Sequence, residues 1–515
     1  MRKLQKQDIL NATESLQQYA MDLSPLHARI RENEAFWRME QGKGTKSAWL
    51  INALLNKHAD AMDNYPQAIV LPRHPEDKQQ AESLRDVLPV ILRHNRYEGV
   101  YSDMWWSKLK YGTAIQGVFW NRDKNRPFGD VHIKNIDILR FYWEPGIDDI
   151  QDSANVFYVS YINEDNFTKK YPNIKIPTGQ SYLLRGITRK NLIPVIDWYY
   201  KTTNNNGKRI LHYCKYAGDS IIYASQNDET LCDKGFYSHG MYPFVCDTLF
   251  TVKGSPVGFG YMDIMKDAQT AIDAINQALL DHARLSSKKR FFIRIDGGVN
   301  EEEFADFNRP FVHVAGSLND DAIREINVNP LDSLCLNLLH SKVDEIKETA
   351  GNRDFNQGST AGGITAASAI AALQEAGNKL SRDMIKSAYR AFTDVCMLCV
   401  ELIRQFYTSP RQINIIEGKN NRFISFTNED MQAKKQSLIA GEDMGWRIPE
   451  YDIVIHPQKA SPFSTLAQNE LAKEFYKLGF FDPTNAQQAL ACISMMNFDG
   501  KDELMANIQS NIMQI

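Results

Sequence analysis

Hydrophobic and polar positions alternate along the chain with two different periods. Over residues 5–109 the apolar positions recur at helical spacing with few turn signals, which predicts a helical region. From Gly112 to Thr251 the pattern changes to short apolar runs separated by turns such as "NNNGK" and "AGDS", typical of an antiparallel β-rich region. Strands are predicted at residues 114–122, 129–136, 154–162, 192–200, 209–216 and 220–225.

A long amphipathic helix is predicted over residues 261–287, which spans about 40 Å. Its apolar positions are spaced by three and four residues: Ile264, Ala268, Ala271, Ile275 and Leu279. A compact insert follows, with short strands predicted in residues 288–298, 309–316 and 322–330.

A second helix is predicted to run to about Ala350, because Asn329 can cap it and Pro330 suits its first position. Its apolar positions are Leu331, Leu334, Leu338 and Ile346. Two helices therefore bracket the small β insert.

After Ala350 come small and polar residues, "GNRDFNQGSTAGG", and then a helical pattern from Thr365 to about Tyr407. As one unbroken helix this pattern would span about 65 Å, and Gly377 is its predicted kink because glycine costs about 1 kcal/mol inside a helix. Strands are predicted at residues 412–418, 422–427 and 451–457, followed by polar helices over residues 464–514. The mixture of separate helical and antiparallel regions predicts the α+β class.

Composition sets the outer limits. The chain has 515 residues, too many for one ordinary core, so about three structural regions are expected. Its net charge of −4 argues against a protein that grips nucleic acid by overall charge attraction.

The expected location is a cytosol, because the polar start lacks the apolar core of a signal peptide and no apolar run reaches the roughly 18 residues of a membrane helix. Seven scattered cysteines fit reduced thiols. Cys396 and Cys399 lie in a helical pattern with no second pair for zinc, so we interpret both as packing residues.

Three glycine-rich stretches invite a nucleotide-site interpretation, and none of them completes the motif. The segment 351–377 lacks the lysine of a phosphate loop and has only Arg353 as a cation near its start. In "QGKGTKS", residues 41–47, Gly44 stands where the hydroxyl residue should follow the lysine. In "GFGYMD", Asp263 replaces the last glycine of a dinucleotide motif.

Other catalytic patterns are also missing from the sequence. There is no His-Glu-x-x-His and no Gly-x-Ser-x-Gly. We interpret the acidic clusters at 300–306 and 319–325 as solvated turns and helix starts, and the aromatic cluster at 101–120 as core. No catalytic residue, metal site or cofactor is predicted.

The order of these regions resembles that of tailed-bacteriophage portal proteins, the head-to-tail connectors of capsids. The match is densest at "GNRDFNQGSTAGGITAASAIAALQEAGNKLSRD", with further likeness at "WEPGIDDIQDSANVFYVSYINEDNFTKKYP" and "FDPTNAQQALACISMMNFDGKDELM". It covers nearly the whole chain, although the C-terminal part is short for a family in which a long barrel can follow.

The resemblance implies a portal fold with a mixed wing, a two-helix stem, a small clip and a helical crown. The implied division is a wing at 1–257, a first stem helix at 258–287, a clip at 288–329, a second stem helix at 330–350, a tunnel loop at 351–364, a long kinked wing helix at 365–408, wing strands at 409–460 and a crown at 461–515.

The resemblance also implies a structural virion protein, not an enzyme, at one capsid vertex, assembled in the host bacterial cytoplasm. Implied partners are eleven further copies in a ring of twelve, double-stranded DNA, the terminase large subunit, a head-tail adaptor, the major capsid protein and a scaffold protein, with no membrane and no cofactor. The tunnel loop would present Asn352, Arg353, Asn356, Gln357, Ser359 and Thr360 to DNA. Lys288, Lys289 and Arg290 of the clip would face phosphate or pair with a neighbour's acidic residues.

Two other classes remain open from the residues alone. A packaging ATPase or nuclease would show nucleotide-dependent or metal-dependent activity. The other is a DNA-binding structural virion protein of another kind. A monomeric or dimeric sequence-specific DNA binder would need a basic reading helix, which the sequence does not show.

Overall fold

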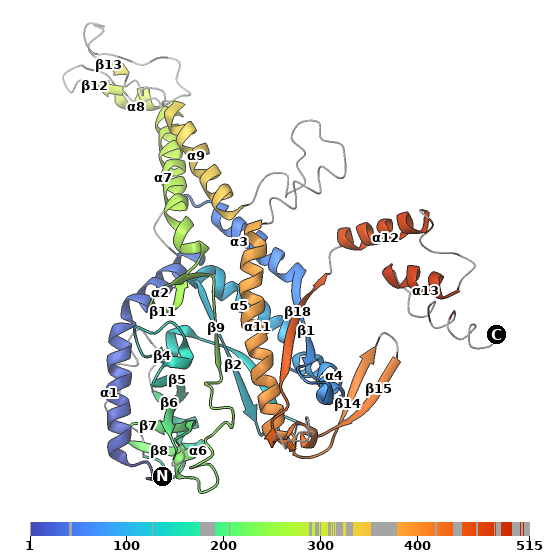
Figure 1. Cartoon of the computed structure of the whole chain (residues 1–515). Helices are drawn as coiled ribbons and strands as arrows, with labels where there is room; N and C mark the ends of the chain where they lie inside the picture. The colour runs from blue at the N-terminus through green and yellow to red at the C-terminus, as the bar shows by residue number, and fades with distance from the viewer. Residues whose placement is uncertain are drawn as a thin grey trace. The chain divides into compact units, whose positions relative to one another are not determined.

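The computed structural model divides the chain into two compact units (Figure 1). The large unit comprises Met1–Glu34, Leu55–Asp263 and Asn378–Ile515, and the small unit comprises Ala35–Leu54 and Ile264–Gly377. The structure describes residues 2–40, 44–125, 127–175, 191–204, 207–287, 291–293, 298, 300–306, 311, 313, 315, 323–325, 333–351, 379–417, 420–435, 445–459, 462–477, 479, 486–496, 505 and 508.

Five helices occupy most of the first 111 residues, in agreement with the predicted helical region. They are α1 (Lys6–Asp22), α2 (Ser24–Trp37), α3 (Trp49–Asp63), α4 (Lys78–His94) and α5 (Tyr97–Tyr111). Helix α1 shows how the sequence specifies such an element. Gln5 and Asp8 form a reciprocal capping box, and Ile9, Leu16 and Tyr19 place one apolar face in the core.

One strand interrupts this region, so the prediction of continuous helices was wrong there. Strand β1 (Asn64–Pro72) pairs antiparallel with β18 (Tyr451–Lys459), and Ile69 lies opposite Val454. The apolar run in β1 fits a helix or a strand equally well by periodicity. Its pairing partner is almost 400 residues away in the sequence, and local patterns cannot reveal it.

Two antiparallel sheets form the β-rich region, and all six predicted strands are confirmed. The first has the order β3 (Asp130–Ile136), β2 (Thr113–Asn121), β9 (Phe244–Thr248). The second runs from β4 to β8 in chain order: β4 (Phe141–Trp143), β5 (Asn155–Asn163), β6 (Leu192–Thr203), β7 (Arg209–Ala217) and β8 (Ser220–Ala224). Aromatic pairs fill the second sheet, and Phe157 stacks on Trp198 directly across β5 and β6.

Shorter elements complete this part of the chain: α6 (Glu164–Lys170), β10 (Phe250–Val252) and β11 (Ser255–Phe259). Helix α11 (Lys379–Phe406) packs against β9 and β2. Cys396 and Cys399 of α11 are fully buried, which confirms that both are packing residues. The predicted kink at Gly377 lies outside the described residues.

After α11 the chain returns to strands, as predicted. These are β14 (Arg411–Glu417), β15 (Asn420–Phe426), β16 (Lys434–Lys435), β17 (Trp446–Arg447) and β18. The described residues that follow include the helices α12 (Pro462–Lys477) and α13 (Ala486–Met495).

The small unit confirms the two helices and two of the three strands predicted in the insert; at 309–316 the described residues, Phe311, His313 and Ala315, belong to no strand. Helix α7 (Tyr261–Ser287) has the predicted bounds, and α9 spans Ser333–Ala350. Between them β12 (Phe291–Ile293) pairs antiparallel with β13 (Ile323–Glu325), so the end of α7 and the start of α9 lead to one sheet (Figure 1).

The acidic cluster at 300–306 is the start of a short helix, as interpreted from the sequence. Helix α8 (Glu301–Ala305) is capped by Asn300, whose Oδ1 accepts a hydrogen bond from the Glu303 amide at 3.3 Å. The proposed cap and first turn of the second helix, Asn329 and Pro330, lie outside the described residues.

The buried face of α7 differs from the predicted stripe. Met265, Ala268 and Ile272 are buried, whereas Ile264 is 42% exposed. Spacing of three and four residues fits two adjacent helix faces, and the sequence alone does not say which one is covered.

Candidate functional surfaces of the small unit

The residues singled out from the sequence for DNA and partner contact all lie outside the described ranges. They are Asn352, Arg353, Asn356, Gln357, Ser359 and Thr360 after α9, and Lys288, Lys289 and Arg290 after α7. The described elements nearest to them in the chain are α7 and α9, and the segment before α3 is bonded to α7.

Residues 44–50 are fastened to one face of α7 by side chains spaced four residues apart. Gln277 Oε1 accepts from the Thr45 amide at 2.8 Å, and Gln269 Oε1 accepts from the Leu50 amide at 2.9 Å. Between them, Asp273 Oδ1 accepts from the Ser47 amide at 2.9 Å and from its hydroxyl at 2.8 Å. We call this arrangement the clamp.

The clamp explains what residues 44–47, the described part of the stretch "QGKGTKS", do in the fold. Gln269 Nε2 donates to Asp273 Oδ1 at 2.9 Å and to the Ser47 carbonyl at 3.0 Å, so the acceptors on α7 are themselves held in place. The amides of Thr45 and Ser47 are bonded to α7, and the Asp273 carboxylate stands where a phosphate would have to approach. This site therefore favours anchoring and disfavours a bound anion.

Sequence reasoning assigned no role to Asp273 and Gln277 and missed their partners. The signal was three acceptor side chains at positions 269, 273 and 277, one turn apart on a helix that also carries a buried apolar face.

A pocket of about 320 Å³ lies beside the clamp, within the small unit. Apolar residues line the pocket from two sides. Phe36, Met39, Leu50 and Ile51 come from the end of α2, the segment after it and α3, and Ala274 comes from α7. The clamp residues line the rest. Such a pocket accepts apolar side chains without breaking the hydrogen bonds of the clamp.

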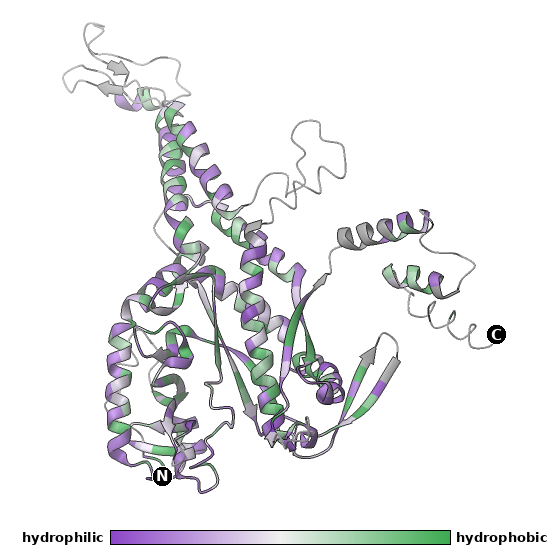
Figure 2. Ribbon diagram, viewed as in Figure 1, coloured by the Kyte–Doolittle hydropathy of each residue, from purple (hydrophilic) through white to green (hydrophobic). Residues whose placement is uncertain are grey.

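Large apolar side chains are exposed on α9 and along α7. Figure 2 marks the hydrophobic residues of both helices in green. Leu334 is 68% exposed and Leu338 is 47% exposed, and Leu336 is also exposed. Ile264, Leu280 and Leu285 of α7 add to this set. Exposed leucines gathered on two helices are typical of a surface that another protein covers.

The C-terminal end of α9, by contrast, is anchored. Ile346 and Ala350 are buried, and Lys347 Nζ lies 5.9 Å from the centre of the Trp49 ring in a cation–π contact. The exposed leucines are therefore confined to the first turns of the helix.

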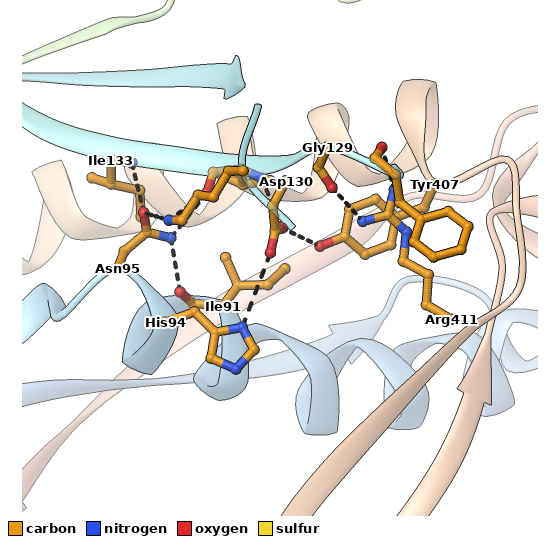
Figure 3. A network of polar contacts seen from close by, with 11 residues as sticks. Ile91, His94, Asn95, Gly129, Asp130, Ile133, Tyr407 and Arg411 are labelled. Atoms are coloured by element: carbon orange, nitrogen blue, oxygen red, sulfur yellow. Dashed lines mark hydrogen bonds and ion pairs between the residues drawn. The ribbon is translucent and has the colours of Figure 1, made fainter. Parts of the chain in front are cut away.

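In the large unit, a buried polar network fixes the end of α11 against the β2–β3 hairpin (Figure 3). Tyr407 donates its hydroxyl to Asp130 Oδ1 at 2.7 Å, and Arg411 Nη1 donates to the Gly129 carbonyl at 2.8 Å. The Arg411 guanidinium also stacks 3.8 Å from the centre of the Tyr407 ring. Burial, with the nearby Asp130 carboxylate, raises the pKa of Tyr407, so the hydroxyl stays a donor.

Asn95 supports the same network from the end of α4. Its Nδ2 donates to the carbonyls of Ile91 at 2.8 Å and Val131 at 3.1 Å, and its Oδ1 accepts from the Ile133 amide at 3.1 Å. The network therefore ties α4, β3 and the end of α11 together, which makes it a scaffold feature (Figure 3).

A groove of about 860 Å³ in the large unit carries three exposed arginines, Arg85, Arg93 and Arg96, over an apolar floor. Asp86, paired with Arg422, and Glu98 lie on the same rim. Because acidic groups interrupt the positive charge, α4 does not present the uniformly basic face that a DNA-reading helix needs.

Within the described ranges, no cluster of three or more His, Cys, Asp or Glu residues is placed to hold a metal ion. The helices that the structure describes include none long and apolar enough to cross a membrane.

In the comparison with protein families, the family described as Phage P22-like portal protein matches residues 50–515 of the chain. No curated protein matches the chain. The matched range includes both helices of the small unit, the pocket residues of α7 and the whole β-rich region.

Proposed function

Since the chain belongs to the Phage P22-like portal protein family, we propose that twelve copies form a ring at one capsid vertex, through which double-stranded DNA is packaged and ejected. The family match over residues 50–515 is the observation that carries this proposal, because it covers most of the chain. The protein is then a structural component of the virion, assembled in the host bacterial cytoplasm, without catalysis or a cofactor of its own.

The exposed leucines of the small unit support ring formation. A closed ring uses heterologous contacts, so each copy needs two different complementary surfaces. Leu334, Leu336 and Leu338 are exposed in a single copy, and burial between copies would remove their apolar surface from water.

We assign the channel contact to residues 351–364, which follow α9 directly in the chain. Asn352, Asn356, Gln357, Ser359 and Thr360 offer exchangeable hydrogen bonds, and the charge of Arg353 is offset by Asp354. A near-neutral lining suits a channel in which DNA must slide, because strong phosphate binding would hold it.

Residues 288–329 are the proposed docking end for the terminase large subunit during packaging and for the head-tail adaptor afterwards. Lys288, Lys289 and Arg290 would take part in this docking. In this proposal the terminase supplies the ATP hydrolysis, while the major capsid protein and a scaffold protein contact the ring from outside.

The native mass of the purified chain, with negative-stain images of the same fraction, tests the proposal. A mass near twelve copies and end-on views of a ring with an open centre are expected. A monomer well above micromolar concentration that hydrolyses ATP would overturn it. A monomer without that activity would be mixed with scaffold protein, and failure to form rings there would also count against the proposal.

A further inference from the structure

We propose that the pocket beside the clamp receives Leu334 and Leu338 from α9 of the neighbouring copy. This inference rests on the proposed ring and goes further, because it names the two surfaces that meet between copies. The pocket is the receiving surface and the first turns of α9 are the inserted one.

The pocket has the chemistry to take apolar side chains. Phe36, Met39, Leu50, Ile51 and Ala274 supply apolar walls. The polar residues of its lining are already engaged, since Gln269, Asp273 and Gln277 bond to residues 45–50 in the clamp. An entering leucine therefore displaces water from apolar walls while those hydrogen bonds remain.

Size and spacing also agree. A cavity of roughly 150 Å³ holds one benzene-sized group, so about 320 Å³ accommodates two leucine side chains. Residues four apart on a helix have Cβ atoms about 5–6 Å apart, as Leu334 and Leu338 do by their positions. The pocket follows α7 from residue 269 to 277, which is about 12 Å at 1.5 Å per residue.

The occupant is a second copy because the described residues of the same copy offer no leucine that fills the pocket. Leu334 and Leu338 are both strongly exposed in their own copy, so they do not fill its pocket. Pocket and leucines are different surfaces of the small unit, and such a pair repeats head to tail until a ring closes.

Disulfide trapping in assembled rings tests the contact. Cys232, Cys246 and Cys335, the three cysteines that are not fully buried, are first replaced by serine. Leu338→Cys is then combined with Ala274→Cys, and rings isolated by size are mildly oxidised. We expect a ladder of covalent oligomers. The amount of disulfide-linked protein should be at least tenfold higher than for Leu336→Cys with Ala274→Cys, because residue 336 lies about 200° around the helix from residue 338.

Mixing the two single-cysteine chains gives a second readout. Copies with only Leu338→Cys and copies with only Ala274→Cys should form disulfide-linked mixed dimers and no larger covalent species. A normal ring in negative stain with no more trapping for Leu338→Cys than for Leu336→Cys would overturn the contact and leave the ring intact. Trapping within one copy would overturn it as well. A wild-type chain that forms no ring would remove both this inference and the proposed function.

Discussion

Lys108 and Asp247 form an ion pair inside the large unit, with Nζ 2.5 Å from Oδ1 and side chains 0% and 1% exposed. The pair joins α5 to β9, and the lysine also lies 4.7 Å from the centre of the Trp105 ring. Burial lowers the pKa of Lys108, and Asp247 opposes this effect. Asp247 therefore helps to keep Lys108 charged.

Removing one member of this pair should destabilise the fold more than removing both. Asp247→Ala leaves an unpaired buried ammonium group, and we expect a loss of about 3–5 kcal/mol in the free energy of unfolding. The double variant Lys108→Met with Asp247→Leu should recover most of this loss, since apolar groups replace both charges. Urea unfolding of all three chains measures the effect, and equal losses in the single and double variants would contradict it.

The hydrogen bond from Tyr407 to Asp130 should contribute to stability through the charge of its acceptor. Tyr407→Phe removes a buried donor to a carboxylate, with an expected cost of about 1.5–3 kcal/mol. Tyr389→Phe is the matched control, because Tyr389 donates to the neutral carbonyl of Asn64 at 2.9 Å and should cost about 0.5–1.5 kcal/mol. Thermal and urea unfolding would show the order, and a larger cost for Tyr389→Phe would refute the assignment.

Much of the fold follows from local pattern. The bounds of α7 and the six strands of the β-rich region were predictable because each element carries its own periodicity and turn signals. The failure at β1 has the opposite cause, since its strand identity depends on β18, far away in the chain.

The functional surfaces were less predictable than the fold. The sequence showed that residues 41–47 lack phosphate-loop spacing, but the clamp required knowing that Ser47 meets Asp273, 226 positions later. The exposure of Leu334 and Leu338 could not be predicted from their spacing, because periodicity reports an apolar face and does not say what covers that face. Lys108 and Asp247 gave no local signal, since each looks like a surface charge in its own segment.

Removing the Asp273 carboxylate should release residues 44–50 from α7. Asp273→Ala deletes the acceptor of the Ser47 amide and hydroxyl, and hydrogen exchange at that amide should accelerate by about tenfold or more, as expected for a hydrogen bond of about 1.4 kcal/mol. Asp281→Ala is the matched control on α7, because Asp281 accepts from Gln277 and touches neither Ser47 atom. Hydrogen exchange is measured by mass spectrometry. Equally fast exchange of the Ser47 amide in both variants would rule out the hydrogen bonds of the clamp.

Two buried histidines should make the large unit sensitive to mild acid. Burial lowers the pKa of His27 and of His212 from 6.5 to about 4. Between these values the unfolded chain binds protons that the folded chain does not, so stability is full above pH 6.5 and falls as the pH drops towards 4. At pH 5 the loss should be on the order of 1–2 kcal/mol per histidine. His27→Leu should flatten the curve of unfolding free energy against pH, and an unchanged slope would refute the role of His27.

Deletion of residues 357–363 separates the proposed channel role from assembly. These residues lie between α9 and α11 in the chain, away from the clamp, the pocket and the α9 leucines in sequence, so rings of normal mass are expected. Packaged DNA per particle and its retention after packaging should both fall. Replacing the same seven residues by a glycine-serine segment of equal length is the control, because it keeps the span and removes the polar side chains of Gln357 and Thr360. A deficit in the deletion alone would assign the effect to loop length, and a deficit in both would assign it to those side chains. Wild-type packaging and retention in both variants, with rings intact, would show that this segment does not serve the channel.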